Sequence, residues 1–261
     1  MGFMNVLAIG DVVGSVGCEH IRSVLPSFKR HRNIDVCVIN GENSSDTNGI
    51  VPASAEHLFT SGADVITTGN HIYRRREIYD YLDEGYAITR PANFNAENPG
   101  KGYYIVDKGR VKIAVINLMG IMYLDPIENP FDCVDRLLLQ DDIKECKIKL
   151  VDFHAEATSE KRAMGFYLDG RVTAMFGTHT HIQTADEQVL ENGTGYITDL
   201  GMSGVIQSVL GVKSQIIIDK FKNNMPARFS FETGDSSMCG CIFEIDEKTG
   251  KTISVERVDI R

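Results

Sequence analysis

The chain has 261 residues, of which 43% are hydrophobic and 24% charged, a composition typical of a globular protein. Its net charge of −9 creates no overall field that would attract nucleic acid or an anionic membrane, so we expect no direct nucleic-acid binding and no membrane association. An anionic substrate would need positive charge supplied locally, by arginines or by a bound metal.

The N-terminal residues and the cysteines favour a cytoplasmic location. The stretch MGFMNVLAIGDVVG lacks the basic segment and the cleavage site of a signal peptide, and no apolar run approaches the roughly 20 residues of a membrane helix. The six cysteines are scattered, which indicates free thiols in a reducing compartment. Cys239 and Cys241 form a C-x-C pair that is better explained as alternate positions of one strand than as metal ligands.

Short β-rich runs alternate with helical patterns through most of the chain. Strands are expected at residues 5–10, 35–40, 64–69, 112–117, 149–153 and 172–177, and helices near 17–31, 53–61, 74–83, 132–145, 159–168 and 213–222. This alternation predicts an α/β fold with largely buried strands. Three later segments, 227–233, 240–246 and 252–260, alternate apolar and polar residues and predict antiparallel strands, the last two joined by a turn at 247–250. Because no linker or repeat divides the sequence, we predict one domain over residues 1–261.

Polar side chains follow five of the predicted strands. The residues are, in order, Asp11; Glu42 and Asn43; Asn70 and His71; His154; and His179 and His181. Ligand sites of open α/β sheets form at this end of the strands, and carboxylate, imidazole and amide groups suit iron, manganese or zinc better than calcium. A lone histidine after a strand is more often a hydrogen-bonded surface residue, but packing alone does not explain five such strand ends.

The number of candidate ligands favours two metals. All of these side chains except His71 are candidate ligands, and seven ligands are more than one catalytic zinc would use. A pair of metals about 3.5–4 Å apart is therefore expected, and Glu42 could bridge them. His179 and His181 are two residues apart, and residues i and i+2 of an extended segment point the same way. Both rings can therefore reach one cluster, although the spacing does not decide whether they share a metal.

The same residues resemble the calcineurin-like metallophosphoesterases, and most closely the YmdB-like branch of bacterial phosphodiesterases. The matching motifs are GDVVG (10–14), INGEN (39–43), GNH (69–71), RPANF (90–94), VDFHAEATSEK (151–161), GTHTHIQTAD (177–186) and YITDLGM (196–202). They extend over nearly the whole chain. The resemblance implies a four-layer α/β/β/α sandwich of two mixed sheets, with two divalent metals, most often iron or manganese, at the strand ends.

The resemblance also implies a role for each residue. Asp11, Asn43 and His181 would bind one metal, Asn70, His154 and His179 the other, and Glu42 both. His71 would be the catalytic proton donor. The chain departs from the wider superfamily in having Val13 where a second histidine is usual, and Glu42 where the bridge is usually aspartate. Arg74, Arg75 and Arg76 would either contact substrate phosphate or begin a solvated helix.

The implied reaction is hydrolysis of a phosphodiester, with 2′,3′-cyclic nucleotides as the substrate class. The two metals would activate a shared water as the nucleophile, and His71 would protonate the leaving oxygen. A phosphomonoesterase acting on nucleotides or phosphoproteins would use the same residues. A third hypothesis is a regulatory nucleotide-binding module that contacts RNA-processing proteins, as this branch suggests. A homo-oligomer is compatible with each.

A nucleotide-cofactor enzyme is the weakest alternative. GDVVGSVG (10–17) loosely matches a glycine-rich phosphate turn, but its G-x-x-x-G-x-x-G spacing differs from that of the dinucleotide fingerprint. No acidic residue ends the second predicted strand, which instead finishes at Asn40 before the turn with Glu42.

Overall fold

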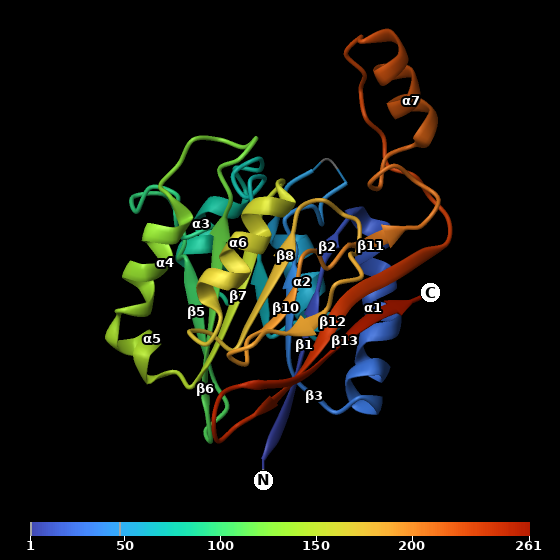
Figure 1. The fold of residues 1–261 in the computed structure, drawn as a ribbon. Helices are drawn as coiled ribbons and strands as arrows, with labels where there is room; N and C mark the ends of the chain where they lie inside the picture. The colour runs from blue at the N-terminus through green and yellow to red at the C-terminus, as the bar shows by residue number, and fades with distance from the viewer. Residues whose placement is uncertain (1, 47) are drawn as a thin grey trace.

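The computed structural model describes residues 2–46 and 48–261, and it shows two mixed β-sheets between layers of helices (Figure 1). The first sheet has the strand order β2-β11-β12-β1-β3-β4, and β13 pairs with β12. Its strands are β1 (Phe3–Ile9), β2 (Asp11–Val12), β3 (Ile34–Asn40), β4 (Val65–Thr67), β11 (Met202–Val205), β12 (Ser236–Asp246) and β13 (Thr252–Ile260). Strands β1, β3 and β4 are parallel, so their carboxyl ends lie at one edge.

The second sheet has the order β5-β6-β7-β8-β10-β9. Its strands are β5 (Tyr103–Asp107), β6 (Lys112–Met119), β7 (Ile148–His154), β8 (Ala174–Thr178), β9 (Gln188–Val189) and β10 (Gly195–Ile197). Strands β6, β7 and β8 are parallel and in register, with Met119 beside His154 and His154 beside Thr178. This register brings the C-terminal ends of three neighbouring strands to one level.

Three apolar layers hold the sheets and helices together. The helices are α1 (Gly14–His31), α2 (Pro52–Ser61), α3 (Ile78–Asp83), α4 (Pro130–Leu138), α5 (Asp141–Glu145), α6 (Thr158–Leu168) and α7 (Ser214–Asn223). Side chains of α1, α2 and α3 pack on the outer face of the first sheet, and those of α4, α5 and α6 pack on the outer face of the second. A third cluster fills the space between the sheets. The predicted α/β/β/α sandwich is therefore confirmed.

Strand β1 illustrates why these segments are almost continuously apolar. Met4, Val6 and Ala8 belong to the cluster between the sheets, whereas Leu7 and Ile9 belong to the cluster under the helices. Successive side chains of a strand point to opposite faces, so a strand covered on both faces needs apolar residues at nearly every position.

The predicted elements are mostly confirmed, with two corrections. The helix expected over 132–145 is two helices, because α4 ends at Leu138 and α5 begins at Asp141. The strand expected over 227–233 is wrong: in this segment only Phe231 is paired, in an isolated bridge with Val212. An alternation of apolar and polar residues forms a strand only when another strand lies next to it. This segment follows α7, which stands apart from the sheets in Figure 1.

The hairpin between β12 and β13 is confirmed, and Gly250 N donates to Asp246 O at its turn. Cys239 and Cys241 occupy alternate positions of β12 as predicted, and both are free thiols. Among the described residues, no helix combines the length and the apolar character needed to cross a bilayer.

Candidate metal centre

The eight predicted site residues meet where the two sheets bring their strand ends together. β1 and β2 place Asp11, and the turn after β3 places Glu42 and Asn43. The loop after β4 places Asn70 and His71, β7 ends on His154, and His179 and His181 follow β8. Each of the eight contacts at least one other member through the hydrogen bonds and ion pairs described below.

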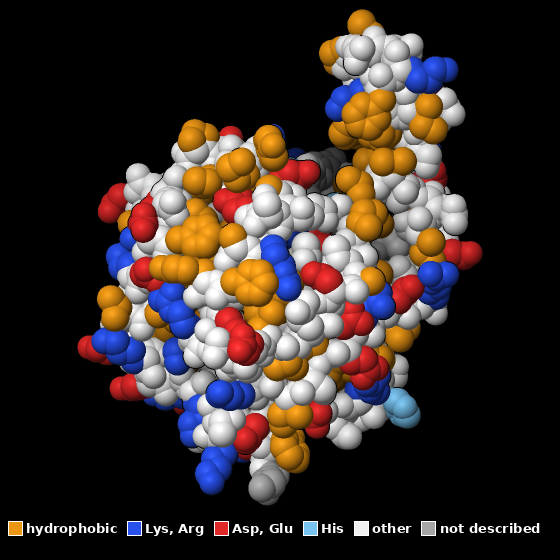
Figure 2. Space-filling view, viewed as in Figure 1, with side chains coloured by type: hydrophobic (Ala, Val, Ile, Leu, Met, Phe, Trp, Pro, Cys, Tyr) orange, Lys and Arg blue, Asp and Glu red, His pale blue; other side chains and the backbone are white. Residues whose placement is uncertain are grey.

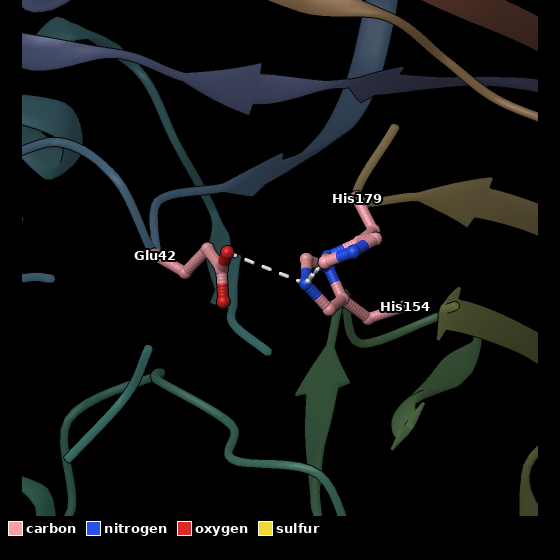
Figure 3. A group of neighbouring side chains, drawn as sticks. All are labelled: Glu42, His154 and His179. Atoms are coloured by element: carbon pink, nitrogen blue, oxygen red, sulfur yellow. Dashed lines mark hydrogen bonds and ion pairs between the residues drawn. The ribbon is translucent and has the colours of Figure 1, made fainter. Parts of the chain in front are cut away.

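His154 is at the centre of the first group of contacts. Its Nε2 atom lies 3.3 Å from Glu42 Oε1, 2.9 Å from Asn70 Oδ1 and 3.0 Å from His179 Nδ1. Ligand-type atoms of Glu42, His154 and His179 all lie within 4.8 Å of one another. Figure 3 shows the three side chains pointing toward one another. His154 and Glu42 are buried, and His179 is partly buried. These three side chains are therefore close enough together to bind one metal ion.

Asp11, Asn43 and His181 form the second group. His181 Nε2 lies 3.6 Å from Asp11 Oδ1 and 3.2 Å from Asn43 Nδ2. Asn43 Nδ2 also donates to Glu42 Oε1 at 3.0 Å, which joins the two groups. The backbone N–H of His179 donates to Asp11 Oδ2 at 3.0 Å. Glu42 therefore lies between the groups, the position that the predicted bridge requires.

His71 lies at the edge of the cluster rather than inside it. Its Nδ1 is 2.9 Å from Asn43 Oδ1 and 3.1 Å from Glu42 Oε1, and its backbone N–H donates to Glu42 Oε2. Nε2 points away from Glu42, 3.4 Å from Asn48 Nδ2. The ring side chain is 20% exposed, so this nitrogen is the one placed toward solvent.

Several features of the cluster fit a bound cation. Asp11 Oδ1 is buried and accepts no hydrogen bond, which is costly for a carboxylate unless a cation binds it. The carboxylate, imidazole and amide groups are the donors that iron, manganese and zinc accept. Coordination by Asn43 would require its amide to turn, because Oδ1 now faces His71 and Nδ2 faces His181.

Gly69 keeps the centre of the cluster open. A Cβ at this position would lie 2.3 Å from His154 Nε2 and 2.5 Å from Glu42 Oε2. Any side chain would therefore fill the space onto which these two groups converge. This explains why the GNH motif begins with glycine.

A buried hydrogen-bond relay sets the orientation of His154. Its Nδ1 lies 2.9 Å from Thr178 Oγ1, and that hydroxyl donates to Asp152 Oδ1 at 2.7 Å. Because the single hydroxyl proton goes to Asp152, Thr178 accepts from Nδ1–H of His154. In the neutral ring, the lone pair then lies on Nε2, which points into the cluster, as a metal ligand requires.

A second buried network holds the turn that carries His179 and His181. Both residues have positive φ angles, 96° and 64°, which are uncommon for non-glycine residues. Between them, the backbone N–H and the hydroxyl of Thr180 donate to Asp199 Oδ2 at 3.1 and 2.7 Å. Lys161 Nζ binds the same oxygen at 2.6 Å, and both charged groups are buried. This anchor offsets the cost of the strained turn.

The neighbouring charges of the cluster favour the ionised form of the Glu42 carboxylate. Burial alone would raise the pKa of Glu42, but His154 and His71 outweigh it and lower the pKa well below its usual value. Burial opposes the charged form of His154, yet the Glu42 carboxylate raises its pKa to about 9. Burial and the neighbouring His154 lower the pKa of His179 to about 3. One proton thus lies between Glu42 and His154, where a metal cation would replace it.

The structure adds residues that the sequence did not single out. Asp152, Thr178, Lys161, Thr180 and Asp199 support the predicted ligands, and Glu156 Oε2 lies 3.0 Å from His179 Nε2. All six lie inside the quoted motifs VDFHAEATSEK, GTHTHIQTAD and YITDLGM. The motifs were therefore the available signal, although they did not state which residue supports which ligand.

Arg74, Arg75 and Arg76 lie in turns before α3, not on a helix. Arg74 and Arg76 are exposed. Arg75 Nε donates to Asn48 O at 3.1 Å, and the side chain of Asn48 contacts His71. The arginines are thus near the exposed side of the cluster, and their contact with substrate stays a prediction.

Known proteins with similar sequences extend these observations. Residues 7–258 match the model of the family described as YmdB-like protein. The chain is 43% identical, over 98% of its length and 96% of the relative, to a 2′,3′-cyclic-nucleotide 2′-phosphodiesterase from Bacillus subtilis. It has a TM-score of 0.94 and 32% identity with a structure titled a novel phosphatase from Mycoplasma pneumoniae, covering 100% of this chain and 94% of that one.

A third relative is a hypothetical protein of known structure from Thermus thermophilus. The TM-score is 0.92 and the identity 34%, over 98% of both chains. The fold is also shared with a structure titled a putative 5′-nucleotidase from Staphylococcus aureus, at a TM-score of 0.65 and 14% identity, covering 99% of this chain and 54% of that one. Because the family model matches residues 7–258, nearly the whole chain, the chain belongs to the YmdB-like protein family.

Proposed function

We propose that this chain is a phosphodiesterase that uses two divalent metal ions and hydrolyses 2′,3′-cyclic nucleotides. The observation that carries the proposal is the convergence of Asp11, Glu42, Asn43, Asn70, His154, His179 and His181, with His71 at the rim. The enzyme class, a phosphoric ester hydrolase, is that of relatives that match essentially the whole chain.

The side chains divide into two ligand sets in this proposal. Asp11, Asn43 and His181 hold one ion, and Asn70, His154 and His179 hold the other. Glu42 contacts both groups and serves as the bridge. When bound, the two ions lower the pKa of water and neutralise the charge that develops on the phosphoryl oxygens. Iron and manganese are the metals we expect from the family.

His71 is placed to move a proton at the leaving oxygen. Glu42 Oε1 accepts from its Nδ1–H, a contact that does not depend on the Asn43 amide, so the ring is held with Nε2 directed outward when Asn43 turns to bind metal. A proton on Nε2 would be available to a substrate lying over the cluster, and transfer of that proton to the departing oxygen would make His71 the general acid. The contact with Asn48 at Nε2 would give way to the substrate.

The substrate class rests on the Bacillus subtilis relative, which is named a 2′,3′-cyclic-nucleotide 2′-phosphodiesterase. A second candidate, phosphomonoesterase activity, is favoured by the Mycoplasma pneumoniae structure titled a phosphatase. Both reactions would use the same residues. A regulatory nucleotide-binding role, an RNA-processing partner, a homo-oligomer, a cytoplasmic location and a single domain over 1–261 remain predictions.

A substrate screen tests the proposal. Purified protein, reconstituted separately with Mn²⁺, Fe²⁺ and Zn²⁺, is assayed with 2′,3′-cyclic AMP, 3′,5′-cyclic AMP, a linear diester and 3′-AMP. We expect the highest kcat/KM for the 2′,3′-cyclic nucleotide. Faster turnover of the monoester would favour the phosphatase. Tight nucleotide binding without hydrolysis of any phosphoester would contradict both and favour the regulatory module.

A further inference from the structure

Two buried cations differ sharply in their surroundings. Among the described residues, Lys161 and Arg90 are the lysine and arginine side chains that are at least nine-tenths buried, at 0% and 5% exposure. Lys161 has the Asp199 carboxylate at 2.6 Å. Arg90, by contrast, forms no ion pair with any described carboxylate. A buried charge without a counter-charge is costly, so Arg90 needs another explanation.

The contacts of Arg90 satisfy only part of its guanidinium group. Nη1 donates to the backbone carbonyls of Pro91 and Ala92, at 2.9 and 3.3 Å. Nε is buried and has no hydrogen-bond partner. Two carbonyl oxygens supply partial negative charge at one nitrogen but leave the positive charge of the group uncompensated. Arg90 belongs to the RPANF motif, which the proposed phosphodiester chemistry does not use.

Arg90 lines a hollow of about 480 Å³ beside the β5 edge of the second sheet. The loop that follows Arg90 forms one wall, with Phe94 and Asn95, and Tyr103 and Gln140 contribute from β5 and from the turn before α5. The volume falls in the range of small-molecule sites. None of the eight residues of the candidate metal centre lines this hollow.

The second arginine of the hollow is already neutralised. Arg136, on α4, donates to Glu128 Oε2 at 2.9 Å, so its charge has a partner at the rim. The net unpaired charge of the site is therefore that of Arg90. A planar guanidinium group binds phosphate and carboxylate groups through paired N–H donors, and it does so better than lysine.

We propose that this hollow is a binding site for a small oxyanion, separate from the metal centre, in which Arg90 binds the phosphate or carboxylate group of a metabolite. Phe94 and Tyr103 supply apolar surface for the rest of such a molecule. The proposal does not depend on the reaction at the metal centre, because no residue is shared between the two sites.

Diffraction with an electron-dense oxyanion locates the site directly. Crystals of metal-loaded wild-type protein are soaked in tungstate, and anomalous peaks are mapped. We expect one peak within hydrogen-bond distance of the Arg90 guanidinium, in addition to any at the metal centre. Arg90→Gln should lose only the first peak. Arg22→Gln, which removes an exposed arginine of α1, should keep both.

Calorimetry of the same metal-loaded proteins gives the affinity and the anion class. Inorganic phosphate and acetate are titrated separately, each against wild type, Arg90→Lys and Arg90→Gln. We expect at least a tenfold loss of affinity at one class of site in Arg90→Gln and a smaller loss in Arg90→Lys. If phosphate is the anion whose affinity falls in Arg90→Gln, the site binds phosphate groups. If acetate is that anion, the site binds carboxylate groups.

The proposal fails if wild-type crystals show no tungstate at Arg90 when the anion is present at the metal centre, or if the peak persists in Arg90→Gln. If Arg90→Gln does not fold, Arg90→Lys takes its place, because it keeps the positive charge. The proposal then fails if wild type and Arg90→Lys bind phosphate with equal affinity and acetate with equal affinity.

Discussion

Glu42 is the residue on which the two halves of the candidate metal centre depend. Its Oε1 atom contacts Asn43, His71 and His154, and the side chain is almost fully buried. A bridge serves each metal, so losing it should weaken both sites.

We predict that Glu42→Ala purifies with both metals depleted, as measured by elemental analysis against protein concentration. Glu145→Ala is a useful control, because this exposed carboxylate of α5 pairs with Lys112 of β6, away from the cluster. A Glu42→Ala protein with full metal content would show that Glu42 does not bridge.

His71 should behave differently from the ligands. Its Nδ1 is held by Asn43 and Glu42, and Nε2 faces outward. His71→Ala should therefore keep its metals and lose about 10²–10⁴-fold in kcat, the usual contribution of a general acid. Metal analysis and kinetics on the same preparation separate the two effects. If the metals are lost instead, His71 is a ligand.

Thr180 tests the anchor beneath the strained turn. Thr180→Val removes the hydroxyl that donates to Asp199 and leaves the backbone bond in place. We expect a loss of about 10–100-fold in metal affinity, the usual effect of removing a group that supports a ligand. The readout is competition with a metal-binding dye. Thr180→Ser restores the donor and should restore the affinity; equal affinity in all three proteins would mean that the anchor does not position the histidines.

At the residue level, the site could be predicted because its members follow buried strands. The eight residues lie at the ends of buried strands or in the turns and loops that follow them, and parallel strands bring such positions to one edge. The supporting residues could not be placed in the same way. Asp199 follows β10 but binds Lys161 of α6, and Thr178 connects His154 to Asp152 through side chains. These contacts depend on how helices and sheets pack together.

Elements were predictable where hydrophobic periodicity was long. The central strands β1, β3, β6 and β7 are covered on both faces, and their apolar runs are nearly continuous. The short strands β2, β9, β10 and β11 contain two to four residues, too few for a periodic signal. The segment 227–233 failed for the opposite reason: its pattern was regular, but its bridge partner Val212 belongs to none of the described strands.

Asp64 connects three elements, and its charge should matter for stability. Its carboxylate binds Lys29 of α1 at 3.0 Å and Lys108, just after β5, at 2.9 Å, and it accepts from Cys37 N of β3 at 2.8 Å. Burial would raise its pKa, but Lys108, Cys37 and Lys29 outweigh burial and lower it. The folded state therefore favours the ionised form.

We predict that Asp64→Asn lowers the free energy of unfolding by about 1–3 kcal/mol at pH 7. A lowered pKa contributes stability above the unfolded value, near 3.8, and the contribution disappears as pH falls through the folded pKa. Urea unfolding of both proteins at pH 7 and pH 3 should show the difference shrinking in acid. A difference that is unchanged at pH 3 would assign the effect to packing.

At the scale of the whole molecule, the candidate metal centre joins the two sheets. Asp11, Glu42 and Asn43 come from the first sheet, and His154, His179 and His181 come from the second. Asn40 of β3 adds a direct bond to Asp152 of β7 at 3.1 Å. Helix α7 stands apart from the two sheets in Figure 1, and Figure 2 shows apolar side chains on its surface. Phe221 of this helix is exposed. The sequence predicted this helix but not its position.

The most direct test is diffraction from crystals of Mn²⁺-loaded protein at the manganese absorption edge. The account predicts two anomalous peaks about 3.5–4 Å apart, both in contact with Glu42, one beside Asp11 and His181 and the other beside His154 and His179. A single peak, or peaks that lie away from these side chains, would contradict it.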